Sequence, residues 1–164
     1  IASGQTISQP YTVAFQTEAL QVKKRDKVLE VGTGSGYQAA ILCELGATLF
    51  TIERQRSLYD FARTLLPKLG YYPQFFYGDG YLGLPTYGPF DKIIVTAGAG
   101  SVPPLLKDQL AIGGKMVIPV GERQHQVMKI ITRESEEDFS ETDAGYFVFV
   151  PLLPGLSDQN STFS

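Results

Sequence analysis

Three glycines at alternate positions follow a short apolar run and leave room for a ligand. Residues 27–31 fit a buried parallel strand, and Gly32, Gly34 and Gly36 come directly after it. Because glycine has no side chain, the backbone N–H groups of such a loop can approach a ligand closely, and the following helix adds its positive N-terminal end. Glu30 lies inside the strand, where it could shape the loop, meet the ammonium group of a bound amino acid, or pair with a nearby donor. Dinucleotide-binding loops usually carry the third glycine one residue later, although the pattern also fits a plain strand–helix turn.

Two further acids follow strands of the same predicted sheet. Glu53 ends the strand predicted over 49–53, where an acid can accept both hydrogen bonds of a ribose diol or cap the next helix. Asp79 follows the strand predicted over 75–77, where it could meet an adenine amino group or serve as a turn residue. The carboxyl ends of parallel strands share one edge, so these acids, the glycine loop and 97–101 should surround one crevice. Acids without a nearby phosphate-binding basic residue favour a cationic ligand that lacks pyrophosphate, and S-adenosylmethionine is such a ligand.

Alternating strands and helices are expected to position these residues. Helices are predicted to begin at Pro10 and to cover 37–45, 54–69 and 103–112. Strands are predicted over 27–31, 49–53, 75–77, 92–97, 115–120, 127–132 and 146–150. Residues 134–143 are predicted to be a solvated acidic link between the last two strands. The predicted fold class is α/β: a doubly wound, mostly parallel seven-stranded sheet with a C-terminal antiparallel β-hairpin.

The composition argues against several classes of protein. A chain of 164 residues fits one domain, and its net charge of −3 argues against a nucleic-acid partner. No apolar run approaches the length of a membrane span. Cys43 is the only cysteine, which excludes an internal disulfide and fits a reducing, cytoplasmic compartment. The only histidine, His125, lies in the turn before the predicted hairpin, so nothing indicates a serine-hydrolase triad.

The most specific pattern lies near the N-terminus. Residues 4–11 read Gly-Gln-Thr-Ile-Ser-Gln-Pro-Tyr and strongly resemble the signature of the protein-L-isoaspartate (D-aspartate) O-methyltransferases. Residues 28–36 resemble motif I of that family, which has the Rossmann-like fold of the class I S-adenosylmethionine-dependent methyltransferases. Further segments resemble its Gly-Asp-Gly turn and its later strands, namely 77–80, 90–97, 110–121 and 149–152. The resemblance covers nearly all of residues 4–153.

The resemblance implies methyl transfer from S-adenosylmethionine to the free carboxylate of L-isoaspartyl and D-aspartyl residues in damaged proteins and peptides. The ester then collapses to a succinimide that can reopen to normal aspartate, which is protein repair. By residue match, Ser8 is the active-site serine, with Thr6 beside it. A substrate carboxylate is ionised at pH 7 and is already a nucleophile, so Ser8 should position it rather than attack. The expected cofactor-binding residues are Glu30, Gly32, Thr33, Gly34, Ser35, Gly36, Glu53, Arg54, Asp79, Gly80 and Thr96, and no metal is expected.

Some features depart from the family's pattern and leave alternatives open. The expected single domain, residues 1–164, lacks the helical segment that family members carry ahead of the signature. The 97–103 loop differs, and Val148 stands where many bacterial members carry an arginine. The alternatives are a methyltransferase acting on another substrate, a nicotinamide-dependent oxidoreductase, and a non-catalytic cofactor-binding fragment. The expected partners are isoaspartyl-containing proteins and peptides, with no nucleic acid and no membrane, and the chain is expected to be a monomer.

Overall fold

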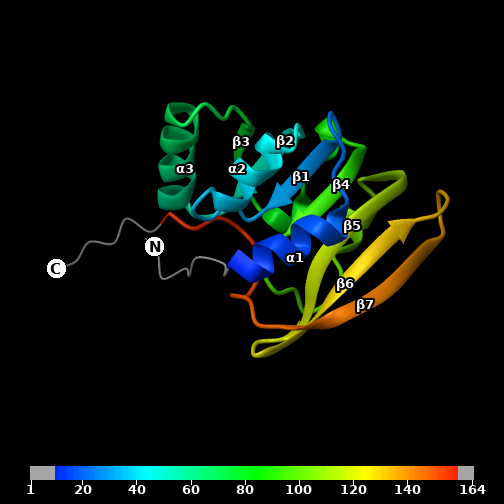
Figure 1. Cartoon of the computed structure of the whole chain (residues 1–164). Helices are drawn as coiled ribbons and strands as arrows, with labels where there is room; N and C mark the ends of the chain where they lie inside the picture. The colour runs from blue at the N-terminus through cyan, green and yellow to red at the C-terminus, as the bar shows by residue number, and fades with distance from the viewer. Residues whose placement is uncertain (1–9, 159–164) are drawn as a thin grey trace.

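The computed structural model describes residues 10–158 and is built around one seven-stranded sheet in the order β3-β2-β1-β4-β5-β6-β7 (Figure 1). The strands are β1 Lys27–Val31, β2 Thr48–Glu53, β3 Gln74–Tyr77, β4 Phe90–Val95, β5 Leu110–Glu122, β6 His125–Arg133 and β7 Phe139–Phe147. The helices are α1 Pro10–Leu20, α2 Tyr37–Glu44, α3 Arg56–Lys68 and α4 Pro104–Lys107, with 3-10 turns η2 Gly80–Leu82 and η3 Pro85–Tyr87. Strands β1 to β5 pair in parallel, and β6 and β7 pair antiparallel at one edge. The predicted fold class is confirmed.

The alternation of side chains along each strand feeds two apolar layers. Val28 and its counterparts on neighbouring strands pack against α1, α2 and α3, which lie on the near face of the sheet in Figure 1. Leu29 and Val31 point to the opposite face, where α4 contributes Leu106. Both faces of the parallel strands are therefore covered, and removing this apolar surface from water is the main favourable contribution to folding.

Two of the helices bury a single stripe of residues against the sheet. The buried residues of α3 are Leu58, Ala62 and Leu66, which are spaced four apart and share one face. Val13, Gln16 and Leu20 are the buried residues of α1, and the Gln16 side chain donates to the Val95 carbonyl oxygen at 3.0 Å. This hydrogen bond ties α1 to the carboxyl end of β4, next to the predicted crevice.

The prediction for residues 103–112 is wrong beyond the first turn. Helix α4 ends at Lys107, and β5 already begins at Leu110, which pairs with Phe90. The Gln109 side chain stops the helix because it bonds across the turn: its amide nitrogen donates to the Leu82 and Leu105 carbonyl oxygens, both at 2.9 Å. The bond to Leu82, which lies 27 residues away, outweighs the local preference for a longer helix.

The last strand is also misplaced by the sequence prediction. Residues 139–143, predicted as part of a solvated link, belong to β7, and 148–150 lie outside it. This edge strand is almost entirely exposed, so it carries no apolar alternation to reveal it. Its backbone pairs with β6, and Lys129 Nζ adds ion pairs to Glu141 at 3.5 Å and Asp143 at 2.9 Å.

After β7 the chain turns back across the carboxyl ends of the parallel strands, as the orange-to-red segment of Figure 1 shows. Gly98 holds it near β4: its N–H donates to the Val150 oxygen at 2.7 Å, and its oxygen accepts the Leu152 N–H at 2.8 Å. Ser157 then pairs with the β2 end, donating to the Arg54 oxygen at 2.8 Å. The C-terminal segment thereby forms a wall along the edge where the sequence predicts a ligand site.

Candidate active site

A cavity of about 310 Å³ lies at the carboxyl ends of β2, β1 and β4. Its floor is the glycine loop, α1 contributes one side, and the C-terminal segment closes the other. The lining includes Thr12, Val13, Gly32, Thr33, Gly34, Ser35, Gln38, Glu53, Arg54, Gln55, Gly80, Thr96, Ala97 and Val148 to Leu153. This volume suits a small organic ligand.

The glycine loop has a geometry that side chains would block. Gly32 has a φ of +98°, and a Cβ there would lie 2.6 Å from Thr96 Oγ1. Thr96 Oγ1 in turn donates to the Gly32 carbonyl oxygen at 2.6 Å, which fixes the loop to the end of β4. Gly34 has a φ of +54°, and a Cβ there would meet nothing within 4 Å. The cavity-lining Gly34 therefore leaves open space for a ligand beside the backbone.

Glu53 links this loop to the end of β2. It is buried, with Oε2 accepting the Gly34 N–H at 3.0 Å and Oε1 accepting the Gln55 N–H at 2.9 Å. An ionised carboxylate has about four acceptor positions, so two backbone donors do not saturate it. Glu53 can accept further hydrogen bonds from a diol in the cavity while it holds the loop.

Glu30 lies beneath the loop and does not line the cavity. Its Oε1 accepts from Thr51 Oγ1 at 2.6 Å, and Thr51 Oγ1 bonds Thr33 Oγ1 at 2.5 Å. Glu30 Oε2 has no hydrogen-bond partner among residues 10–158. Burial raises the pKa of Glu30 to about 8, so the carboxyl is mostly protonated at pH 7. The chain from Glu30 through Thr51 to Thr33 supports the loop-shaping interpretation.

Asp79 serves as a turn residue, which is one of the two roles expected for it. Its Oδ1 accepts the Tyr81 N–H at 2.9 Å, which caps η2, and its Oδ2 accepts the Gly155 N–H at 2.9 Å. The carboxylate does not line the cavity, whereas the neighbouring Gly80 does. Asp79 thus anchors the C-terminal wall, and an adenine contact stays a prediction.

The structure brings most of the predicted cofactor residues into one cavity. Those that line it are Gly32, Thr33, Gly34, Ser35, Glu53, Arg54, Gly80 and Thr96. Glu30, Gly36 and Asp79 lie outside the lining; Gly36 is the N-cap of α2, and a Cβ there would lie 3.3 Å from Leu66 Cδ1. Ser8 and Thr6 fall outside the described residues.

Sequence reasoning missed the walls of the cavity. Thr12 and Val13 enter from α1, Gln38 from α2, and 148–153 from the C-terminal segment. Only the apolar run Phe-Val-Pro-Leu at 149–152 offers a signal, because it is too short for a helix and follows a strand. Its docking on Gly98 depends on contacts about fifty residues apart, which no local pattern encodes.

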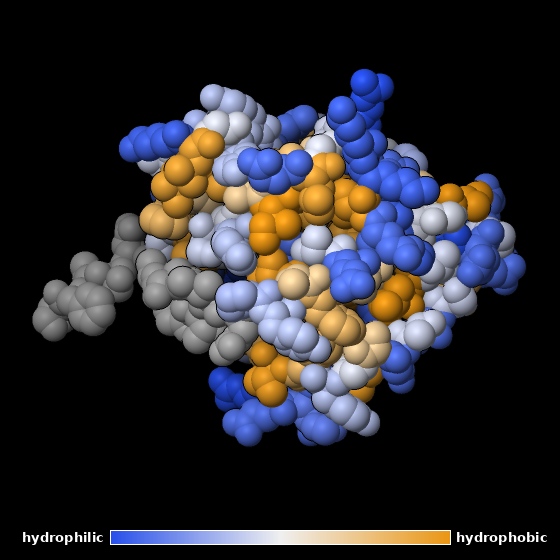
Figure 2. Space-filling model, in the orientation of Figure 1, coloured by the Kyte–Doolittle hydropathy of each residue, from blue (hydrophilic) through white to orange (hydrophobic). Residues whose placement is uncertain are grey.

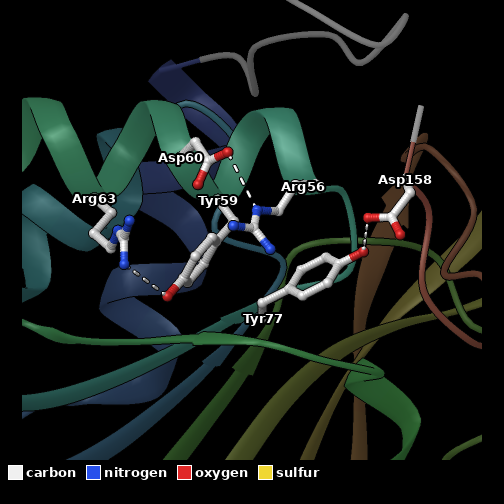
Figure 3. A network of polar contacts seen from close by, with 6 residues as sticks. All are labelled: Arg56, Tyr59, Asp60, Arg63, Tyr77 and Asp158. Carbon is white, nitrogen blue, oxygen red and sulfur yellow. Dashed lines mark hydrogen bonds and ion pairs between the residues drawn. The ribbon is translucent and has the colours of Figure 1, made fainter. Parts of the chain in front are cut away.

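Polar and aromatic contacts fasten the far end of this wall (Figure 3). The Tyr77 hydroxyl donates to Asp158 Oδ1 at 2.7 Å, and the Arg56 guanidinium lies 5.4 Å from the Tyr77 ring centre and 5.8 Å from the Tyr59 ring centre. Arg54 Nε donates to the Gly155 oxygen at 3.1 Å. The wall is therefore fixed both at β4, through Gly98, and beside β2 and β3.

Comparison with known sequences decides the family. The family profile of protein-L-isoaspartate(D-aspartate) O-methyltransferase (PCMT) matches residues 1–157. The chain belongs to this family.

Curated relatives and solved structures agree with that membership. A protein-L-isoaspartate O-methyltransferase of Flavobacterium psychrophilum is 60% identical over 154 residues, which are 93% of this chain and 72% of that protein. One from Christiangramia forsetii is 58% identical with the same coverage. Both relatives are longer than this PCMT chain.

Solved structures of the family share the fold. A protein-L-isoaspartate O-methyltransferase structure superposes with a TM-score of 0.85 at 27% identity, over 95% of this chain and 52% of that one. The chain therefore spans about half the length of that solved protein. A second, from Plasmodium falciparum and in complex with S-adenosyl-L-homocysteine, gives a TM-score of 0.77 at 26% identity and covers 93% and 78% of the two chains.

In the part of the chain from 10 to 158, no helix is long and apolar enough to cross a membrane. Within the same residues, no cluster of histidine, cysteine, aspartate and glutamate side chains could hold a metal ion.

The buried Glu30 should make the stability of the fold depend on pH. Between pH 4.5 and about 8 the folded chain keeps a proton on Glu30 that the unfolded chain releases. The contribution of this proton to the free energy of unfolding is complete below pH 4.5. It is lost as the pH rises toward about 8, by up to about 1.4 kcal/mol per pH unit. Glu30→Gln should flatten this slope, because the amide does not titrate.

Urea unfolding at a series of pH values measures that slope. The matched control is Glu18→Gln, at an exposed position of α1, which should keep the wild-type slope. Equal slopes in wild type and Glu30→Gln would contradict a protonated buried carboxyl.

Proposed function

We propose that this chain transfers a methyl group from S-adenosylmethionine to the free carboxylate of L-isoaspartyl and D-aspartyl residues in damaged proteins and peptides. The methyl ester is the first step of repair through a succinimide. The observation that carries the proposal is the cavity over the glycine loop, where Gly34 and Glu53 meet in a chain of the PCMT family. The Plasmodium relative that shares the fold binds S-adenosyl-L-homocysteine, the product left when S-adenosylmethionine gives up its methyl group.

The donor set of the cavity fits S-adenosylmethionine. Glu53 offers a buried carboxylate for the ribose diol, and the open side of Gly34 admits the ligand close to the backbone. Arg54 also lines the cavity, with its Nε bonded to the Gly155 oxygen of the C-terminal segment. Bound there, S-adenosylmethionine would supply an activated methyl group on a positively charged sulfur.

The protein's own contribution is then orientation and exclusion of water. The substrate carboxylate needs no general base, because it is ionised at pH 7. Holding an ionised carboxylate and a methyl donor in line can account for about 7–11 kcal/mol of the barrier. The rigid loop, α1 and the wall at 148–153 are placed to provide this alignment.

Substrate positioning is assigned to Ser8, with Thr6 beside it. These residues directly precede α1, whose first turn contributes Thr12 and Val13 to the cavity. We expect no nucleic-acid or membrane partner, a monomeric chain and a cytoplasmic location, in line with the acidic net charge of −3 and a single cysteine.

Methyl transfer to a matched peptide pair tests the proposal. The peptides differ only in an isoaspartyl or an aspartyl linkage, and the ester is followed by mass spectrometry in the presence of S-adenosylmethionine. Only the isoaspartyl peptide should gain a methyl group. Turnover of both peptides would indicate another methyltransferase, and cofactor binding without turnover would indicate a non-catalytic fragment.

The ribose role of Glu53 is tested by Glu53→Gln. The amide keeps the shape but removes the charge that strengthens its hydrogen bonds, so the Kd for S-adenosylhomocysteine should rise about 10- to 100-fold. Isothermal titration calorimetry measures the change, with the exposed Glu137→Gln as the matched control. An unchanged Kd would remove Glu53 from the binding site.

Substitution of Ser8 distinguishes a role in substrate binding from a role in cofactor binding. Ser8→Ala should lower kcat/KM for the isoaspartyl peptide about 10-fold, since one hydrogen bond to a charged group is lost. The Kd for S-adenosylhomocysteine should stay unchanged in the same calorimetric assay. Loss of cofactor affinity instead would place Ser8 on the cofactor.

A further inference from the structure

The two ends of the cavity differ in charge. Glu53 and Arg54, at the β2 end, are its charged lining residues within the described part of the chain. The β4 end, between α1 and the C-terminal wall, is lined by Thr12, Val13 and 148–150 and carries no charge. With Glu53 assigned to the ribose in the proposed function, the neutral β4 end is the part of the cavity left for a peptide substrate.

Large apolar side chains are exposed around that end. Val148 lines the cavity although 72% of its surface is accessible, and Tyr11, in the first turn of α1, is 71% exposed. The Tyr11 ring lies 6.4 Å from the ring of Phe147 and nearly parallel to it, at 15°. We call Tyr11, Phe147 and Val148 the apolar rim; Phe147 is half-buried, and Val148 is the member that lines the cavity. Exposed apolar side chains that adjoin a cavity are typical of binding surfaces.

The apolar rim rests on a fixed base. Phe147 packs against Phe15 at 4.9 Å between ring centres. On the other side of Val148, the Phe149 N–H donates to Gln126 Oε1 at 2.7 Å and the Val150 oxygen accepts from Gly98. Because its neighbours are held, Val148 can contact a ligand with little ordering cost.

The surface around the apolar rim is mixed. Figure 2 shows apolar surface next to the hydrophilic turn between β5 and β6, on the face where α1 begins and β7 ends. Glu122 and Arg123 in that turn carry opposite charges, so the turn favours neither sign of ligand. Selection by charge at this end would therefore come from the cost of removing a charged side chain from water.

We propose that the apolar rim binds the side chain next to the isoaspartyl residue of the substrate, and that it selects aliphatic or aromatic neighbours over charged ones. The occupant is a segment of the substrate peptide, because the rim is continuous with the cavity where the carboxylate must react. This specificity rests on the proposed methyl transfer. An apolar neighbour gains from burial against Val148 and Tyr11, whereas a lysine or glutamate loses water without gaining a partner.

A peptide panel tests the selection. Isoaspartyl peptides carry alanine, phenylalanine, glutamate or lysine immediately before or after the isoaspartate, and KM and kcat are measured for each. Binding of the same peptides is measured by calorimetry with the protein saturated with S-adenosylhomocysteine. In at least one of the two positions, phenylalanine should lower KM about 5-fold or more relative to glutamate, with a smaller change in kcat.

Variants of Val148 connect the selection to the apolar rim. Val148→Ser should reduce the phenylalanine-to-alanine ratio of kcat/KM about 3-fold, since apolar contact is lost. Val148→Glu should raise kcat/KM for the lysine peptide about 2- to 5-fold over wild type, a gain that misfolding cannot produce. The matched control is Tyr72→Ala, which changes a 77% exposed tyrosine outside the lining of this cavity and should leave every ratio unchanged.

The outcomes are distinguishable from failure of the proposed function. If no isoaspartyl peptide is methylated, the methyl-transfer proposal fails. If all are methylated with equal KM, or if both Val148 variants keep the wild-type ratios, the apolar rim does not contact the neighbouring side chain. Equal ratios would also result if another part of the protein covered the rim, and that result equally overturns this inference.

Discussion

The turn after β1 passes so close to β4 that it has no room for a side chain, and the site depends on this approach. At Gly32 a single added carbon would meet Thr96 Oγ1. The contact is also a bond, because the same hydroxyl donates to the Gly32 oxygen. With the loop held there, the Gly34 N–H reaches the Glu53 carboxylate on β2. Three strand ends are thereby locked together, and the cavity between them keeps a defined shape before any ligand arrives.

The second constraint is a polar group inside an apolar layer. Glu30 faces the side of the sheet that α1, α2 and α3 cover, and it is fully buried. A charged carboxylate there would be costly, so the group keeps its proton at neutral pH and bonds Thr51. An apolar residue would enter the layer with a smaller desolvation cost, but it would leave the Thr51 hydroxyl without this acceptor. A buried polar residue therefore lies at the point where it supports the loop, as is common in binding sites.

The sequence predicts the central strands well and the edges poorly. The bounds of β1 agree with the prediction because an apolar run lies between Asp26 and Gly32, and both signals are local. The glycine loop and Glu53 are predictable for the same reason. Strand β7 is not, since its side chains are exposed and its pairing partners lie on β6. The position of Asp79 was predictable, but its partner Gly155 lies 76 residues further along the chain, and no local pattern shows that contact.

The C-terminal segment contributes to both of the binding tasks proposed for the carboxyl ends of the strands. Near β2 it is tied by Arg54 and Asp79, so the wall beside the charged end is rigid and polar. Near β4 it is tied through the backbone of Gly98, which leaves the Val148 side chain outward and apolar. A small, constant ligand is best held by fixed polar groups, because each bond can be aligned. A variable peptide is bound better by a neutral surface whose contacts need no aligned hydrogen bonds, since many different side chains can bury some area against it. The difference in charge between the two ends is what the proposed binding of a constant cofactor at one end and a variable peptide at the other would require.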